Sequence, residues 1–157
     1  MSVAAQLLEK ARETGVMVAC AESCTGGMVA AALTDLPGSS ALLDRGFVTY
    51  TNAAKVAMLG VSEVTLAQWG AVSEQVAEEM ATGALAHSEA QIAVSITGIA
   101  GPGGSEHKPE GRVCFGLATA AGVQTETIEF GAQGRGTVRL AARDHALGLL
   151  LQGFAAL

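Results

Sequence analysis

Aromatic side chains are scarce in this sequence, at 4% of 157 residues. Proteins that bind single-stranded nucleic acid stack its bases on aromatic rings, so this scarcity argues against such a surface. Basic residues are also few: nine lysines and arginines stand against 15 acidic residues, for a net charge of −6. A protein of this charge repels polyanions, and we therefore expect no nucleic-acid partner. A small anionic ligand held by a local group of cations is still compatible with it.

The sequence has few cysteines, and their spacing does not suggest disulfide pairs. The three are Cys20, Cys24 and Cys114. This odd number indicates reduced thiols in a cytoplasmic protein. Polar and charged side chains interrupt the N-terminal segment, so we expect no signal peptide, and no apolar run approaches the roughly 20 residues that cross a bilayer. No spacing suits zinc and no acidic cluster suits magnesium, so we expect no metal, no cofactor and no membrane contact.

The length and the apolar pattern predict one domain over residues 1–157. Helices are expected over residues 2–14, 28–36, 52–59, 62–70, 73–87 and 137–154. Strands are expected over residues 16–20, 45–50, 91–96, 113–120 and 123–130, the last two as a hairpin. Because helices alternate with strands and one hairpin interrupts them, the sequence predicts an α/β fold. We expect a three-layer α/β/α sandwich with a mixed, partly parallel sheet.

A turn of polar and small residues, Glu22 to Gly27, follows the first predicted strand. It places Ser23 at the C-terminal end of a strand, where ligands bind in open α/β sheets. The N–H groups of the helix that follows could stabilise an oxyanion there. An ordinary helix N-cap explains this serine equally well. The Gly-x-Ser-x-Gly motif is absent, so the sequence does not indicate an α/β-hydrolase.

A nucleophilic serine needs a base, and nothing in the sequence supports a Ser-His-Asp triad. Lys55 is surrounded by the small apolar side chains of residues 53–58. Partial desolvation would lower the pKa of this lysine and let it act as a neutral base. A solvated helix lysine is the ordinary alternative, and the residues alone favour it.

Two further segments could hold an anion. The glycine-rich loop 97–104 follows a predicted strand, so its backbone N–H groups could approach an anion closely, although its spacing fits neither a dinucleotide fingerprint nor a Walker A loop. Arg135, Arg139 and Arg143 form one stripe along the last helix, which suits a phosphate or carboxylate. A plain surface turn and a solvated helix face are the competing interpretations.

Taken together, four segments in this order resemble the C-terminal domain family of the competence/damage-inducible protein CinA. They are residues 21–27, 46–55, 70–74 and 95–104. The resemblance covers nearly the whole chain and is to the stand-alone form of the family, whose members are nicotinamide mononucleotide deamidases. One departure is that the family's Gly-Asp-Arg before the last helix is replaced by Gln133-Gly134-Arg135.

The resemblance implies a Ser23–Lys55 catalytic pair assisted by Tyr50. Neutral Lys55 would take the proton of Ser23, which would attack the carboxamide of nicotinamide mononucleotide and release ammonia. The expected substrate-binding residues are Glu22, Thr25, Gly26, Thr97, Gly98, Gly101, Arg135 and Arg139. We expect this reaction to serve pyridine nucleotide salvage in the cytoplasm, without a cofactor, in a homo-oligomer.

Two other classes of function stay open. A non-catalytic module that binds a pyridine nucleotide would keep the glycine loop and the arginines without an activated serine. A thiol amidase would use Cys24 as its nucleophile, because cysteine needs less activation than serine. A small buried hydrophobe is the ordinary interpretation of Cys24.

Overall fold

The computed structural model describes residues 1–157 and confirms the predicted α/β/α sandwich. The strands are β1 (Val18–Glu22), β2 (Leu43–Val48), β3 (Ile92–Gly98), β4 (Arg112–Thr119) and β5 (Gly122–Glu129). The helices are α1 (Val3–Thr14), α2 (Met28–Leu33), α3 (Asn52–Leu59), α4 (Glu63–Trp69), α5 (Glu74–Ala86) and α6 (Arg135–Ala155), with the short 3-10 helix η1 (Ser39–Ala41). No helix has the length and apolar character that crossing a membrane requires.

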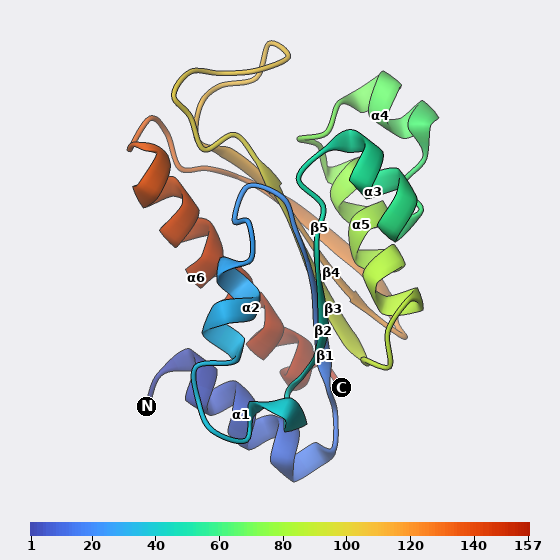
Figure 1. Cartoon of the computed structure of the whole chain (residues 1–157), viewed down its shortest axis with the longest axis vertical. Helices are drawn as coiled ribbons and strands as arrows, with labels where there is room; N and C mark the ends of the chain where they lie inside the picture. Colours follow the sequence, from blue (N-terminus) through green and yellow to red (C-terminus); the bar gives the residue numbers. More distant parts are fainter.

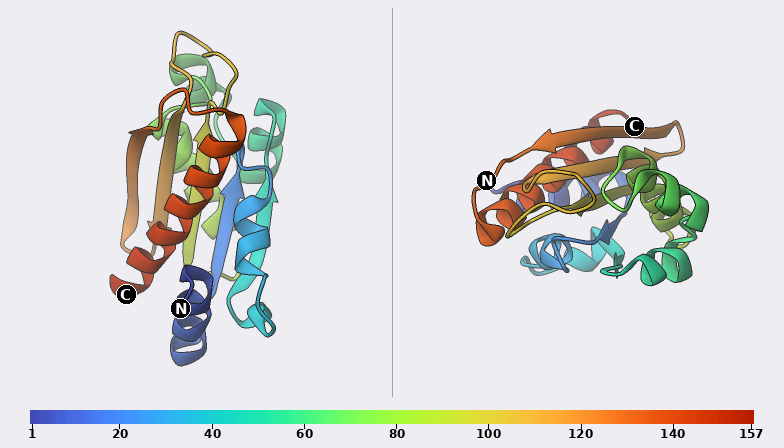
Figure 2. Two further views of the ribbon diagram at one scale, coloured as in Figure 1. Left: turned by 90° about the vertical axis from the view of Figure 1, so that its left-hand side faces the viewer. Right: turned by 90° about the horizontal axis from the view of Figure 1, so that it is seen from above.

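The five strands form one mixed sheet in the order β2-β1-β3-β4-β5. Strand β1 pairs in parallel with β2 and β3, whereas β4 pairs antiparallel with both β3 and β5. Helices α1, α2 and α6 cover one face of the sheet, and α3, α4 and α5 cover the other (Figures 1 and 2). The C-terminal ends of β1, β2 and β3 therefore meet at one edge, beside the long loop between β3 and β4.

Seven predicted boundaries were wrong by two or three residues: both ends of β1 and of β2, the ends of β3 and α2, and the start of α6. Strand β1 begins at Val18, not at residue 16, because Met17 is held by Gln91: its N–H donates to Gln91 Oε1 at 2.9 Å. Strand β2 ends at Val48, not at residue 50, so that the next residues form the link to α3. Helix α2 ends at Leu33 because the Thr34 hydroxyl turns back onto the carbonyls of the last turn.

The two sides of the sheet pack differently. Large aliphatic side chains fill the side under α1, α2 and α6, whereas mainly small side chains such as Ala19 and Ala93 face α5. Small residues also let helices approach one another closely: a Cβ atom at Gly83 of α5 would overlap the backbone of Leu59, the last residue of α3. This contact seats α3, which carries Lys55, directly on α5.

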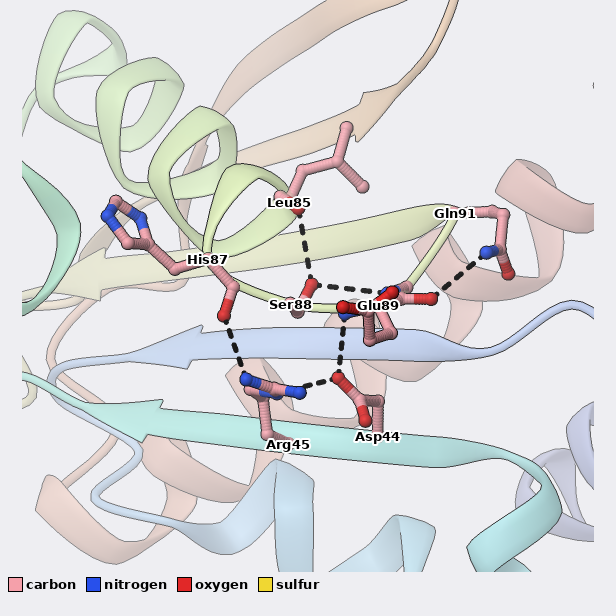
Figure 3. Close-up of polar contacts among 8 residues, drawn as sticks. Asp44, Arg45, Leu85, His87, Ser88, Glu89 and Gln91 are labelled. Atoms are coloured by element: carbon pink, nitrogen blue, oxygen red, sulfur yellow. Dashed lines mark hydrogen bonds and ion pairs between the residues drawn. The ribbon is translucent and has the colours of Figure 1, made fainter.

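A network of polar contacts anchors the opposite end of the sheet, where β2 begins (Figure 3). Arg45 Nη1 donates to the carbonyl of His87 at 3.2 Å. Asp44 Oδ2 accepts from Arg45 Nε at 2.6 Å and from the backbone N–H of Glu89 at 2.9 Å. These bonds tie the edge strand β2 to the connection between α5 and β3, and so support the strand that leads to Lys55.

Candidate active site

Ser23 lies directly after β1, at the edge of the sheet where the three parallel strands end. Its backbone N–H donates to the carbonyl of Ile96 in β3 at 3.0 Å, which holds the residue against the neighbouring strand. The residue is 9% exposed and lines a cavity of about 330 Å³. The sheet therefore presents the Ser23 side chain to a cavity at its carboxyl edge, as expected for a ligand site in this class of fold.

Lys55 reaches this serine from α3. Its Nζ lies 3.1 Å from Ser23 Oγ and donates to the carbonyl of Thr49 at 3.0 Å. Lys55 is 2% exposed, and none of the ion pairs in the structure involves it. Burial lowers the pKa of Lys55, while the nearby Cys24 opposes that shift in part. An amine that is buried without a counter-charge favours its neutral form, which can accept a proton.

Glu22 does not face the cavity. It is fully buried, and its carboxylate accepts the backbone N–H groups of Gly27 at 3.2 Å, Val29 at 3.0 Å and Ala30 at 3.0 Å. A carboxylate at the start of a helix is favourable because it pairs with N–H groups that have no partner within the helix. Glu22 thus holds the start of α2 and does not line the cavity. The prediction that it binds substrate directly is therefore not supported by its position.

In the turn after Ser23, the backbone N–H groups of Cys24 and Thr25 make no hydrogen bond to another residue. The neighbouring N–H groups are occupied: Gly26 donates to the carbonyl of Ser23, and Met28 donates to that of Thr25, each at 3.0 Å. The unpartnered pair immediately follows the serine in the chain. Cys24 and Thr25 are therefore the backbone donors that could stabilise an oxyanion formed at Ser23.

The thiol of Cys24 is poorly suited to act as the nucleophile. The residue lines the cavity but is only 5% exposed. Burial raises the pKa of Cys24 to about 11, although Arg139 and Lys55 lower it in part. Because the thiolate is the reactive form, this shift favours an inert thiol.

Tyr50 and Arg135 line the cavity together. Arg135 Nη2 donates to the Tyr50 hydroxyl at 2.6 Å, and Nη1 donates to the carbonyl of Gly101 at 2.8 Å. Tyr50 makes no hydrogen bond to Lys55 or Ser23, so its hydroxyl is oriented by the arginine. The first residue of α6 thereby connects the glycine loop to the segment that leads into α3.

Arg139, one turn further along α6, is directed elsewhere. Its Nε donates to the carbonyl of Cys24 at 3.0 Å, and its Nη2 donates to that of Thr25 at 3.3 Å. It does not line the cavity, and neither do the fully buried Thr25 and the neighbouring Gly26. Arg143 forms an ion pair with Asp144 at 2.8 Å. The three arginines of the stripe predicted from the sequence thus contact three different sets of partners.

The far wall of the cavity joins the glycine loop to the segment between α4 and α5. Thr97 Oγ1 donates to the carbonyl of Ala71 at 2.8 Å. Lys108 Nζ donates to the carbonyls of Trp69 and Val72, each at 2.6 Å. Thr97, Gly98 and Gly101 all line the cavity, as the sequence analysis expected of substrate-binding residues.

Three polar residues at the site were not predicted from the sequence: Thr49, Asn52 and Glu106. Thr49 orients Lys55 through its carbonyl, and Asn52 and Glu106 line the cavity. Thr51 caps α3 by accepting the N–H of Ala54 at 3.1 Å. This cap could have been recognised in the sequence, and it places Asn52 in the first turn of the helix that carries Lys55. No pattern in the sequence indicated that Thr49 contacts Lys55 or that Glu106 lines the cavity.

The fold and the site define an α/β/α protein with a polar cavity built around a serine and a buried lysine. The chain belongs to the CinA C-terminal domain family, which matches residues 1–154. It is 52% identical over 155 residues to the nicotinamide-nucleotide amidohydrolase PncC of Escherichia coli K12, covering 98% of this chain and 94% of that protein. The PncC protein of Enterobacter agglomerans is 56% identical over 142 residues, covering 89% of this chain and 86% of that protein.

Solved structures agree with this assignment. The competence/damage inducible protein CihA from Agrobacterium tumefaciens has a TM-score of 0.92 and 49% sequence identity, covering 96% of this chain and 92% of that chain. The competence damage-inducible protein A from Klebsiella pneumoniae has a TM-score of 0.93 and 37% identity, covering 98% and 95% of the two chains. The family resemblance predicted from the sequence is confirmed.

Proposed function

We propose that this chain is an amidohydrolase that converts nicotinamide mononucleotide to nicotinate mononucleotide and ammonia. Ser23 is the nucleophile and Lys55 is its base. The observation that carries this proposal is the 3.1 Å separation of Lys55 Nζ and Ser23 Oγ at a lysine that is 2% exposed. The names of the similar proteins from E. coli and E. agglomerans support the reaction and the substrate class.

In the acylation step, neutral Lys55 accepts the hydroxyl proton of Ser23 as Oγ attacks the carboxamide carbon. The N–H groups of Cys24 and Thr25 stabilise the oxyanion of the tetrahedral intermediate. Protonated Lys55 then gives its proton to the departing nitrogen, and ammonia leaves an acyl-serine ester. In the second step Lys55 takes a proton from water as the water oxygen attacks the ester carbon. The C–Oγ bond then breaks, protonated Lys55 returns its proton to Ser23 Oγ, and the product leaves as the nicotinate carboxylate.

The charges that line the cavity match the proposed substrate. Nicotinamide mononucleotide has a cationic pyridinium ring at one end and an anionic phosphate at the other. Arg135 is exposed at the cavity and can bind the phosphate as a charge-assisted partner, beside Thr97 and the glycine loop. Glu106 is the one acidic side chain among the lining residues and can attract the cationic ring. The cavity volume of about 330 Å³ is in the usual range for small-molecule sites.

The two alternative functions are less well supported. A module that only binds a pyridine nucleotide has no need of a lysine that is buried against a serine. A thiol amidase would require a nucleophile whose pKa burial has instead raised to about 11. The Ser23–Lys55 pair accounts for both features.

The setting of the reaction is part of the proposal. We place the protein in the cytoplasm, because its three cysteines are all free and buried. We place the reaction in pyridine nucleotide salvage, because its proposed substrate and product are pyridine nucleotides. Residues 1–157 form one catalytic unit, which needs no cofactor. A homo-oligomer is also part of the proposal. Light scattering during size-exclusion chromatography measures that state directly.

An ammonia-release assay on nicotinamide mononucleotide, with nicotinate mononucleotide identified as the second product, tests the proposed function. The purified parent protein should release both products in equal amounts, and the Ser23→Ala variant should release neither above a trace. A parent protein that binds the nucleotide without releasing ammonia would instead support the binding module.

A further inference from the structure

We infer that Arg139 is a positioning residue for the oxyanion site: it orients the backbone of Cys24 and Thr25 and does not bind substrate. The inference rests on the proposed function, because it concerns the intermediate formed at Ser23. It also separates Arg139 from Arg135, although both lie on the same face of α6.

Arg139 donates its hydrogen bonds to the backbone of the turn that follows Ser23. Two of its guanidinium nitrogens contact two successive carbonyls, those of Cys24 at 3.0 Å and Thr25 at 3.3 Å. Arg139 is half-buried, forms no ion pair and is absent from the residues that line the cavity. A guanidinium in this position contacts the turn from the side that faces α6.

The contact with the Cys24 carbonyl also fixes the direction of the Thr25 N–H, because both groups belong to one peptide. The only cis peptide bond in the chain precedes Pro102, so the bond between Cys24 and Thr25 is trans. In a trans peptide the C=O and N–H groups point in opposite directions within one plane. Because Arg139 binds the carbonyl of Cys24, the N–H of Thr25 points away from α6. This N–H therefore lies on the other side of the peptide from the Arg139 guanidinium, and it makes no hydrogen bond to another residue.

Further hydrogen bonds hold the rest of this turn in place. The next peptide is fixed at both ends, since Arg139 binds the carbonyl of Thr25 and the N–H of Gly26 donates to Ser23. Glu22 holds the following residues through their N–H groups. Arg139 and Glu22 thus bind opposite groups of one turn and leave the N–H groups of Cys24 and Thr25 free. Such donors are most effective when they are already oriented before the oxyanion forms.

The experiment compares the Arg139→Met variant with Arg12→Met. Arg12 is a matched control, because it also donates to a backbone carbonyl, that of Pro37 at 3.4 Å, but lies on α1 away from the cavity. Arg139→Met should lower kcat on the order of 10²-fold, the effect of losing an oxyanion donor, and change KM by less than about threefold. The loss should be equally large with nicotinamide riboside, which has no phosphate. Arg12→Met should retain parental kcat and KM.

A second variant and a second measurement keep the inference testable without turnover. Arg139→Lys keeps the charge but not the two-pronged contact, so it should fall between the parent and Arg139→Met. Nuclear magnetic resonance should show broadened or shifted amide signals for Cys24, Thr25 and Gly26 in Arg139→Met but not in Arg12→Met. Thermal unfolding establishes that each variant is folded.

The outcomes separate the two proposals. A rise in KM with parental kcat, present with the mononucleotide and absent with the riboside, would make Arg139 a phosphate ligand and overturn the inference. Unchanged amide signals in a folded Arg139→Met protein would overturn it as well. A parent protein with no amidase activity would overturn the proposed function, while the amide signals would still decide the role of Arg139 in the turn.

Discussion

Lys55 Nζ lies 3.1 Å from Ser23 Oγ, and its other partner is the neutral carbonyl of Thr49. No acidic side chain stabilises the charged form of this lysine. The arrangement differs from a Ser-His-Asp triad, in which an aspartate holds the base in its orientation. Here the orientation comes from a backbone carbonyl at the end of β2, and burial supplies the shift in pKa. Both properties can be tested one residue at a time.

Replacing the nucleophile should abolish turnover. Ser23→Ala removes the covalent route, so kcat for ammonia release should fall by at least ~10³-fold. Cys24→Ala removes the neighbouring thiol but keeps its backbone N–H, and it should retain most of the activity. Near-parental activity of a folded Ser23→Ala protein, or inactivity of Cys24→Ala, would direct attention to the thiol mechanism.

Activity should rise with pH through the lowered pKa of Lys55. The base must be neutral, and a lysine is neutral above its pKa. Because burial lowers this pKa, kcat/KM should reach its plateau below the pH at which an ordinary lysine loses its proton. Lys55→Arg stays protonated throughout, so it should be as inactive as Lys55→Ala. A pH–rate profile of the parent and the activity of the arginine variant test this, and an active Lys55→Arg protein would require a different base.

Arg135 should contribute to binding of the phosphate. Arg135→Ala removes a charge-assisted contact, which typically contributes about 1.5–3 kcal/mol, and the loss should appear mainly in KM. Tyr50→Phe, which deletes the hydroxyl that Arg135 contacts at 2.6 Å, should show a smaller change in the same direction. Steady-state kinetics with nicotinamide riboside provide the control, because a substrate without phosphate should be insensitive to both substitutions. Equal losses with both substrates would mean that Arg135 acts on the structure of the loop instead.

Glu106 should favour a substrate with a cationic ring. Reduced nicotinamide mononucleotide has the same carboxamide, ribose and phosphate but an uncharged ring. In a Ser23→Ala background, calorimetry should show that Glu106→Gln weakens binding of the oxidised nucleotide about three- to fivefold, the size expected of a partly exposed charge pair. Binding of the reduced nucleotide should be unchanged. Glu89→Gln makes the same change of charge outside the cavity and should affect neither ligand.

Much of the fold could be predicted because its signals are local. Gly15 ends α1 in a left-handed conformation, and the Ser73 hydroxyl caps α5 by accepting the N–H of Val76. The start of β1 could not be predicted in this way, because Val16 and Met17 are as apolar as the strand itself. Only the contact of Met17 with Gln91, which is distant in the sequence, decides where the strand begins.

The site was predictable in part for the same reason. The family motifs identify Ser23 and Lys55, but the burial of Lys55 depends on Thr49 and on the helix packing around α3. Helical spacing correctly placed Arg135 and Arg139 on one face of α6. It could not show that the turn after β1 approaches the second of them, so that two similar side chains contact different groups. Contacts between distant segments were beyond what a single sequence reveals.

The close contact between Gly83 of α5 and Leu59 of α3 links the packing of α5 to the position of Lys55. Leu59 ends the helix that carries Lys55, and an added methyl group at Gly83 would overlap its backbone. Such a change would have to displace α3, and with it the amine, while leaving every cavity residue intact. The distance between Lys55 Nζ and Ser23 Oγ therefore depends on helix packing in the outer layer. Variation at this interface could therefore change the position of the amine without a substitution in the cavity lining itself.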